Sequence, residues 1–548
     1  MSRTNALRNL IRALRLAQFC EQRRIPTAEG IERAAAAADT AHRERESRRR
    51  FLAGAGSLAL AGGTAAVTPF GRAFAAPRPP TIDVGIVGAG MAGLACADTL
   101  RVRGIRATLH EGRERVGGRV WSMGASFAGP VEFPGQVVER GGELIDTTHT
   151  TMKGYAREFG IELEEMAKAW LPGESRFHLQ GRLVPEAEVV EEWRALVAML
   201  RPDVAQLSNY IDAFANTGFD RSIDQTSLAD YLRSRGAGPL ITAALDVAFT
   251  TEYGLEIAQQ SALSLLFFMH IDRRSRFQPF GVFSDERYHC TRGNEQIPEA
   301  IAARLPGPFL PGRRLLAVRK RSDGRLQLAF DEAGRTVTAM HDAVVLTIPF
   351  NLLRGVEFDA SVGLTPDKRY AIDHVVYGAN AKLHVGMRGR FWGAYGSNGE
   401  VWADLPDTQV VWEPNPSAAS ATSAVLLDYS GGERALALDS RKVQAEASRF
   451  LADVDLALPG AQAHAVRDAR GRILAHMNHW PSDPYAMGGY TANQPGYFTR
   501  ILGKEAPPVG NLLFAGETTD SFYEWQGFME GAANSGIRAA GEVLELAG

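Results

Sequence analysis

Cysteine is scarce in this chain: its 548 residues include only Cys20, Cys96 and Cys290. No Cys-x-x-Cys pair occurs, so the sequence predicts neither a disulfide framework nor a zinc ribbon. His476 and His479 stand close together without cysteine or acidic neighbours, and we expect no metal site there. Cys96 falls on a predicted helix and is expected to be a small buried apolar residue.

A large excess of charge of one sign is also absent. The chain has 60 Lys and Arg against 63 Asp and Glu, a net charge of −3, which argues against a general affinity for nucleic acids. Its 45% hydrophobic and 22% charged residues are typical of a soluble globular protein. A chain of this length is expected to fold as two or three domains.

The first 75 residues have the pattern of an export signal. An arginine-rich stretch ends in Ser-Arg-Arg-Arg-Phe-Leu at 47–52, and an Ala- and Gly-rich run follows to about Phe70. Ala73-Phe74-Ala75 offers a cleavage site, and 77–80 reads as a linker. The pattern predicts a twin-arginine (Tat) signal, the Tat machinery as a partner, and a periplasmic or secreted protein.

Two further expectations concern this N-terminal region. Its apolar run is too glycine-rich for a stable membrane span, so we expect none in the mature form. We expect the region to be separate from the fold, although the apolar spacing over 8–19 predicts an amphipathic helix.

A glycine-rich turn between a strand and a helix begins the folded region. The run 82–87 is apolar enough for a buried parallel strand, 94–102 is helical in pattern, and a second strand over 107–110 leads to Glu111. This arrangement is the βαβ unit that binds a dinucleotide. A helix N-terminus at this turn offers free N–H groups to the phosphates.

The glycines of the turn have distinct expected roles. Gly88 allows the tight turn, Gly90 lets the backbone approach a pyrophosphate, and Gly93 lets the helix pack closely on the strand. Glu111 stands where a carboxylate can accept hydrogen bonds from both ribose hydroxyls.

The residues after Glu111 indicate which dinucleotide is bound. Arg113 and the triplet Gly117-Gly118-Arg119 complete a Glu-x-Arg-x-x-x-Gly-Gly-Arg pattern. This pattern resembles the flavin amine oxidase family, which binds FAD. In that setting Gly118 allows close backbone approach, and Arg119 can neutralise the diphosphate.

The resemblance extends over about residues 81–546 and implies an α/β fold. The segments 291–298, 511–517 and 527–540 are similar to family segments around the flavin. The resemblance implies a Rossmann-like FAD-binding domain with a discontinuous α+β substrate-binding domain. We expect the FAD-binding domain to comprise 81–146, 285–348 and 483–548, and the substrate-binding domain 147–284 and 349–482. The resemblance further implies FAD contacts from Leu315, Gly516, Glu517 and Met529.

Lys382 is the first residue for which the resemblance implies a catalytic role. In the predicted strand 382–387, Lys382 and His384 share the face opposite three apolar residues, and such a face is usually solvated. The family segment, which also continues into Phe-Trp, carries a lysine that holds a water at flavin N5. The resemblance therefore implies that Lys382 positions a water or assists flavin reoxidation by O2.

Three aromatic residues are the other catalytic candidates. Trp480 resembles a residue of the family stretch that passes the flavin ring, and Tyr490 and Phe528 match the aromatic positions that flank the substrate nitrogen. The alternative for each is an ordinary core aromatic. Gly489 stands where some members carry a cysteine linked to the flavin, so we expect non-covalent FAD.

The resemblance implies an FAD-dependent amine oxidase that converts an amine or L-amino acid to an imine and reduces O2 to H2O2. L-amino-acid oxidases often carry an arginine where this chain has Leu144, which favours amines, although Arg287 or Arg292 could substitute. Glu143 could contact a cationic substrate or be structural. An L-amino-acid oxidase, a flavin desaturase of carotenoid or porphyrinogen type, and a flavin-binding protein without turnover stay open, as does a homodimer.

Overall fold

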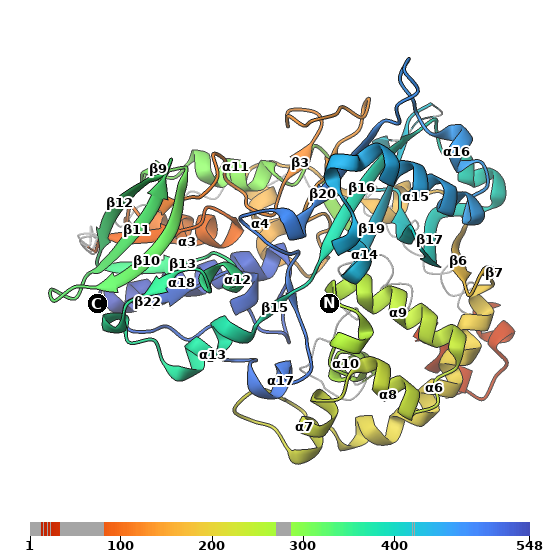
Figure 1. The fold of residues 1–548 in the computed structure, drawn as a ribbon, viewed down its shortest axis with the longest axis horizontal. Coiled ribbons are helices and arrows are strands. Elements are labelled where there is room, and N and C mark those ends of the chain that lie inside the picture. Colours follow the sequence, from red (N-terminus) through yellow and green to blue (C-terminus); the bar gives the residue numbers. More distant parts are fainter. Residues whose placement is uncertain are drawn as a thin grey trace, which may run out of the picture.

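A computed structural model describes residues 82–269, 286–418, 420 and 422–548, together with 13–32 except 15, 19 and 22. The predicted twin-arginine motif, apolar run and cleavage site lie outside the described residues. Figure 1 shows the chain as two parts side by side, each built around a β-sheet, with a layer of helices below the second sheet. Among the described helices, none is both long and apolar enough to cross a membrane.

The first sheet is parallel and has five strands in the order β22-β13-β1-β2-β9. β1 is buried along its whole length, as its apolar sequence predicts. Its strands come from segments far apart in the sequence, which agrees with the expected α/β class. They are β22 (Leu512–Phe514), β13 (Ala343–Leu346), β1 (Val84–Val87), β2 (Thr108–His110) and β9 (Phe309–Leu310).

Helices α3 (Met91–Val102) and α18 (Met529–Leu546) pack together beside this sheet (Figure 1). A Cβ on Gly536 would lie 2.1 Å from the Ala92 carbonyl oxygen, so glycine is what lets the two helices approach. The sequence predicts helices over 94–102 and 531–546, and these lie within the two elements. Cys96 on α3 is fully buried, as predicted.

A four-stranded sheet adjoins the first one, and it contains strands that the sequence predicts over 315–318, 326–330 and 337–339. Its order is β12-β11-β10-β14, with β10, β11 and β12 forming an antiparallel meander. The four strands are β12 (Arg335–His341), β11 (Leu326–Glu332), β10 (Arg313–Lys320) and β14 (Glu357–Phe358).

The second large sheet has seven strands, β20-β16-β19-β18-β17-β6-β7, and is mixed. The local sequence of 147–272 predicts helices, as at 228–233 and 243–249, and this prediction is wrong for part of the stretch, because β6 pairs in parallel with β17. That pairing partner is distant in sequence, so local pattern could not reveal it. The strands are β20 (Ala475–His479), β16 (Asn380–Met387), β19 (Ala424–Gly431), β18 (Thr408–Trp412), β17 (Ser397–Leu405), β6 (Glu174–Leu179) and β7 (Arg182–Val184).

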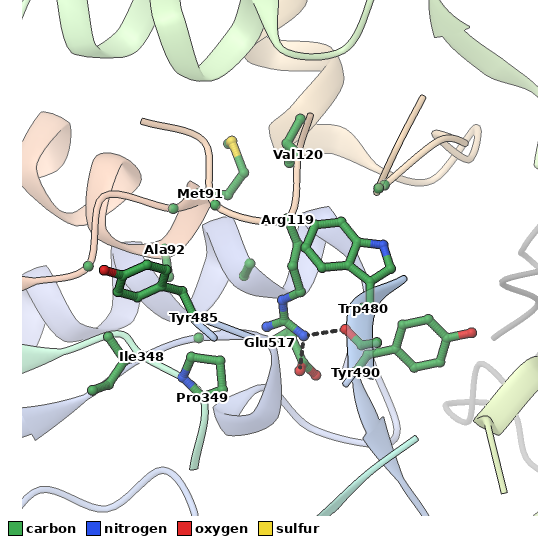
Figure 2. A pocket seen from close by; sticks show the side chains of 18 of the residues that line it. Met91, Ala92, Arg119, Val120, Ile348, Pro349, Trp480, Tyr485, Tyr490 and Glu517 are labelled. Carbon is green, nitrogen blue, oxygen red and sulfur yellow. Dashed lines mark hydrogen bonds and ion pairs between the residues drawn. The ribbon is translucent and has the colours of Figure 1, made fainter. Parts of the chain in front are cut away.

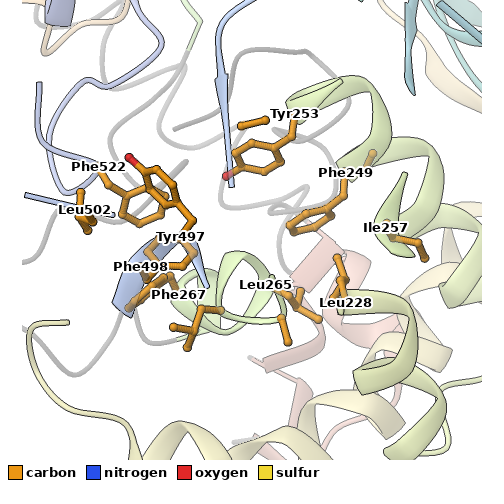
Figure 3. Close-up of a cluster of buried hydrophobic side chains, with 14 of the residues drawn as sticks. Leu228, Phe249, Tyr253, Ile257, Leu265, Phe267, Tyr497, Phe498, Leu502 and Phe522 are labelled. Atoms are coloured by element: carbon orange, nitrogen blue, oxygen red, sulfur yellow. The ribbon is translucent and has the colours of Figure 1, made fainter. Parts of the chain in front are cut away.

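The remaining helices mostly cover this second sheet and its lower side. Figure 3 shows an aromatic cluster that joins them: Phe498 lies 5.0 Å from Phe267 and 4.5 Å from Phe522 between ring centroids. Edge-to-face pairs of this kind add to the burial of apolar surface. From residue 82 onward, the remaining α-helices of the described chain are α4 (Thr150–Glu158), α5 (Met166–Ala169), α6 (Glu186–Gln206), α7 (Gly218–Asp224), α8 (Leu228–Ser234), α9 (Pro239–Tyr253), α10 (Leu263–Met269), α11 (Gln296–Ala303), α12 (Phe350–Leu353), α13 (Pro366–His374), α14 (Gly432–Ala437), α15 (Val443–Ala457), α16 (Ala461–His464) and α17 (Tyr497–Arg500).

The described part of the N-terminal region packs onto the fold. Leu14 and Cys20 are buried, and Arg194 of α6 forms an ion pair of 2.8 Å with Glu21 and donates a hydrogen bond of 2.7 Å to the Thr27 hydroxyl. The expectation that this region is separate from the fold was therefore wrong for 13–32. Of the apolar residues that predict an amphipathic helix, Leu14 is buried in the same core cluster as Val190 and Trp193 of α6.

Candidate active site

A cavity of about 540 Å³ lies between the parallel sheet and the seven-stranded sheet. Its walls come from the turn after β1, the segment after β2, the start of β16 and the loops around 480–490 and 516–529. It brings together nearly all the residues that the sequence singled out. The predicted residues that line it are Gly88, Gly90, Glu111, Arg113, Gly118, Arg119, Leu315, Lys382, Trp480, Tyr490, Gly516, Glu517, Phe528 and Met529.

Gly93 is the one predicted residue outside the lining, and its position explains why. A Cβ there would lie 1.9 Å from the Gly88 carbonyl oxygen, so Gly93 lets α3 start close against the turn. Gly88 itself has φ of +106°, which favours glycine. A Cβ on Gly118 would lie 3.2 Å from the Cα of Gly90. The glycines thus form a narrow backbone cradle open to the cavity, which suits a pyrophosphate.

Glu111 is tied to the turn by two backbone hydrogen bonds. Its Oε2 accepts from the Ala89 N–H at 2.6 Å and its Oε1 from the Arg113 N–H at 2.8 Å. Burial raises the pKa of the Glu111 carboxyl, and the two N–H donors oppose that shift. The carboxylate is held at the end of β2, the position expected for a ribose contact.

The two arginines of the predicted FAD motif are fixed by residues from the end of the chain. Arg119 Nη1 donates to the Gly489 carbonyl at 2.6 Å and to Glu517 Oε1 at 3.0 Å (Figure 2). Arg113 Nη2 lies 2.5 Å from Asp483 Oδ1. These contacts leave both side chains on the cavity wall.

Lys382 is buried and not solvated, which rules out a surface lysine. Its Nζ donates to Glu143 Oε2 at 2.5 Å, to the Gly141 carbonyl at 2.8 Å and to the Glu139 carbonyl at 3.2 Å. Glu143 also accepts a hydrogen bond of 2.8 Å from Trp412 Nε1. All three ammonium protons therefore meet protein acceptors, and a water would bind Lys382 only in place of one of them.

Two carboxyls beside Lys382 differ in their surroundings. Burial raises the pKa of Glu139 to about 8, against hydrogen bonds from the Asn294 N–H and the Ser122 hydroxyl. Glu143 instead accepts hydrogen bonds from the Lys382 ammonium and the Trp412 indole. The site thus contains one carboxylate paired with a cation and one carboxyl that burial drives toward its neutral form.

The three aromatic candidates line the cavity at the same end as Lys382. Tyr490 and Tyr429 share a hydrogen bond of 2.8 Å between their hydroxyls. Trp480 Nε1 donates to the Arg140 carbonyl at 3.1 Å, and Figure 2 shows its indole beside Tyr490. Phe528, at the start of α18, has Trp525 at 5.8 Å between ring centroids.

Among the lining residues that sequence reasoning missed are Tyr429 and Trp412. Tyr429 pairs directly with Lys382 across β19 and β16, and Trp412 ends β18. The sequence offered little indication of their role, because an aromatic residue at the end of a strand most often packs in the hydrophobic core. Only the strand order shows that they share a wall with Lys382.

The substrate end of the cavity has no arginine in the place where sequence reasoning looked for one. Leu144 lines the cavity, whereas Arg287 and Arg292 do not, and Arg287 is paired with Glu165 at 2.7 Å. The suggestion that these arginines substitute gains no support. The cationic residues lining the described cavity are Arg113, Arg119, Arg313, Arg314 and Lys382.

Comparison with known proteins decides what kind of site this is. Residues 91–544 match the family of flavin-containing amine oxidoreductases. The chain belongs to this family. FAD is accordingly its cofactor, and the glycine cradle, Glu111 and the arginine pair suit the dinucleotide. Across the described residues, no group of three or more His, Cys, Asp or Glu side chains is arranged to hold a metal ion.

Relatives with several activities are similar to this enzyme. An L-amino-acid oxidase of Pseudechis australis is 24% identical, over 84% of this chain and 86% of the relative. A putative flavin-containing monoamine oxidase of Mycobacterium tuberculosis is 27% identical, over 86% and 99%. Putrescine oxidase bound to putrescine has a TM-score of 0.68 at 21% identity, over 85% and 99%. Cyclohexylamine oxidase from Brevibacterium oxydans also has 0.68, at 19% identity over 85% and 99%.

The enzyme is therefore a flavin-dependent amine oxidase, which oxidises the C–N bond of an amine or L-amino acid and reduces O2 to H2O2. This family assignment favours an amine oxidase over the two alternatives, a flavin desaturase and a flavin-binding protein without turnover.

Proposed function

We propose that this enzyme oxidises amines that lack an α-carboxylate in preference to L-amino acids. The observation that carries the proposal is Leu144 on the cavity wall, where an apolar side chain offers nothing to a carboxylate. The lining cations have other partners: Lys382 is held by Glu143 and Arg119 by Glu517. Arg313 donates its backbone N–H to the Glu111 carbonyl at 2.8 Å, which puts it at the ribose end.

Bound FAD would supply the hydride acceptor and the route of electrons to O2. In our proposal Gly88, Gly90, Glu111 and Arg119 hold its dinucleotide part. Gly118, Arg113, Leu315, Gly516, Glu517 and Met529 complete that set.

The remaining lining residues would prepare the amine. Trp480, Tyr490 and Phe528 would form the walls beside the nitrogen and exclude water. An apolar aromatic wall disfavours an ammonium, so it favours the neutral amine whose lone pair stabilises the developing iminium. Lys382 would stand as a fixed cation beside the flavin and assist reoxidation by O2.

An L-amino-acid oxidase is the second candidate, since relatives from Pseudechis australis and Naja atra carry that name. Peroxide release measured on a panel of amines and L-amino acids tests the proposal. Peroxide from amines supports it, and peroxide from L-amino acids alone would establish the second candidate.

We further propose that the FAD-binding and substrate-binding domains have the boundaries given above. We also propose that the enzyme is exported by the Tat machinery and works in the periplasm or outside the cell. The support for export is the Ser-Arg-Arg-Arg-Phe-Leu sequence at 47–52. Replacement of Arg48 and Arg49 by lysine should leave active enzyme in the cytoplasm, and unchanged activity in the periplasmic fraction would contradict export by the Tat route. A homodimer remains part of the proposal, with analytical ultracentrifugation as its test.

A further inference from the structure

Glu143 and Lys382 form a buried ion pair on the wall of the active-site cavity. Their charged atoms are 2.5 Å apart, and their side chains are only 5% and 6% exposed. Both line the cavity, so the small exposed part of each faces the space that substrate would enter. The pair therefore decides what charge the substrate meets there.

The carboxylate of Glu143 is suited to this position because two donors converge on it. Lys382 Nζ donates to Oε2, and Trp412 Nε1 donates to Oε1 at 2.8 Å. A carboxylate has acceptor capacity for both, whereas a glutamine amide has one oxygen and a donor group in place of the other. Glutamine at this position would leave Lys382 or Trp412 without its acceptor.

Lys382 has no proton left for a substrate carboxylate. The other two N–H groups are taken by the Gly141 and Glu139 carbonyls. A substrate carboxylate could bind Lys382 only in place of one of these three acceptors, and its charge would compete with that of Glu143 for the ammonium. Displacement of Glu143 replaces one charge-assisted hydrogen bond by another and leaves Glu143 as a buried anion without its cation, which is costly.

We infer that Glu143 is a specificity-determining residue that disfavours substrates with an α-carboxylate by occupying Lys382. This inference rests on the proposed function, because it gives a second physical reason for the preference for amines besides Leu144. It also explains why a cation on the cavity wall need not act as a carboxylate anchor.

The test compares Glu143→Gln, Lys382→Met and the double variant, each purified with FAD. The ratio of kcat/KM for L-phenylalanine to kcat/KM for phenethylamine is measured for each. Glu143→Gln should raise this ratio at least tenfold, about 1.4 kcal/mol, because it removes the negative charge that pairs with the ammonium. The double variant should lose that gain, since the cation is gone. Glu143→Ala is a second variant with the same expected result if the glutamine variant folds poorly.

Binding of 3-phenylpropionate, a carboxylate without an amine, gives a readout that does not depend on turnover. Its Kd, followed through the visible spectrum of the bound flavin, should fall at least tenfold in Glu143→Gln and return in the double variant. Glu165→Gln breaks an ion pair with Arg287 outside the cavity lining and serves as the matched control, with no change expected.

Two results would overturn the inference. One is an unchanged ratio and an unchanged Kd in both folded, FAD-loaded Glu143 variants. The other is a gain that persists when Lys382 is also replaced, or a loss of amine binding that does not depend on Lys382, since Glu143 would then contact substrate directly. The proposed function fails separately, if the wild-type enzyme itself prefers the amino acid.

Discussion

The guanidinium of Arg119 lies 3.0 Å from the carboxylate of Glu517, although the two residues are 398 positions apart in the chain. Arg119 follows the Gly117-Gly118 pair near the start of the fold, and Glu517 follows β22 near its end. Arg119 also donates to the Gly489 carbonyl. The pair therefore joins the first and last segments of the cavity wall beside the residues proposed to hold FAD.

Glu517→Gln should weaken both FAD retention and stability. Glutamine keeps one acceptor but loses the charge, and a hydrogen bond to a charged group contributes about 2 kcal/mol. Thermal unfolding of the FAD-loaded protein and the Kd for FAD measure the two effects. Glu188→Gln, which removes the exposed partner of Arg182, is the control and should leave stability and FAD binding nearly unchanged. Equal losses in both variants would contradict the role given to Glu517.

Lys382→Met should leave FAD bound but slow turnover at least tenfold. The expected site of the defect is reoxidation, because the cation beside the flavin is lost. Enzyme reduced with dithionite and mixed with O2 in a stopped-flow instrument isolates that half-reaction from substrate binding. The substitution also leaves Glu143 buried without its cation, so the unfolding free energy should fall by about 3 kcal/mol. Wild-type rates in both half-reactions would remove Lys382 from the chemistry.

Glu139 should make stability depend on pH. Burial raises the pKa of its carboxyl in the folded protein to about 8, from an ordinary value of 4.5. The folded state therefore holds this proton more tightly, and the stability it confers below about pH 4.5 is lost as the pH rises to about 8. The slope from one such proton is at most about 1.4 kcal/mol per pH unit.

The matched variant for this effect is Glu139→Gln, which cannot ionise. Denaturant unfolding of both proteins at several pH values should show the variant gaining on the wild type between about pH 4.5 and 8. Parallel curves over that range would mean that the Glu139 carboxyl titrates alike in the folded and unfolded states.

FAD should be released from this protein by acid without proteolysis. Gly489 precedes Tyr490 and has no side chain to form a thioether. Cys96 and Cys290 are buried and do not line the cavity, and burial raises the pKa of both thiols above their usual range. Acid precipitation should leave the yellow colour in the supernatant, identified as FAD by chromatography. A flavin-linked peptide recovered from the pellet would contradict this expectation.

The local sequence was enough to predict the dinucleotide-binding unit, because β1, the Gly88 turn and α3 are contiguous in the chain. Glycine is required in this turn by the positive φ of Gly88 and by the close approach of backbone atoms, and any βαβ unit of this kind has the same requirements. The strand carrying Lys382 was also foreseeable from its alternation. The same alternation suggested a solvated face, and it could not show that β16 lies inside a sheet with β19 and β20 on its two sides.

The sequence could not show which residues contact each other across the fold. Glu143 reaches Lys382 across 239 positions, and β6 pairs with β17 in a stretch that looked helical. The docking of 13–32 on α6 was missed for the same reason, since an amphipathic helix does not indicate what covers its apolar face. The substrate end of the cavity is formed by contacts of this kind, so it is the part of the site that could least be predicted from the sequence.

The preference for amines over L-amino acids is tested most directly by kcat/KM for phenethylamine and for L-phenylalanine, measured by peroxide release from the same enzyme preparation. With Leu144 on the wall and Lys382 held by Glu143, the amine should match or exceed the amino acid. A preference for L-phenylalanine above about tenfold, or about 1.4 kcal/mol in transition-state binding, would contradict the account and require a carboxylate anchor elsewhere in the protein.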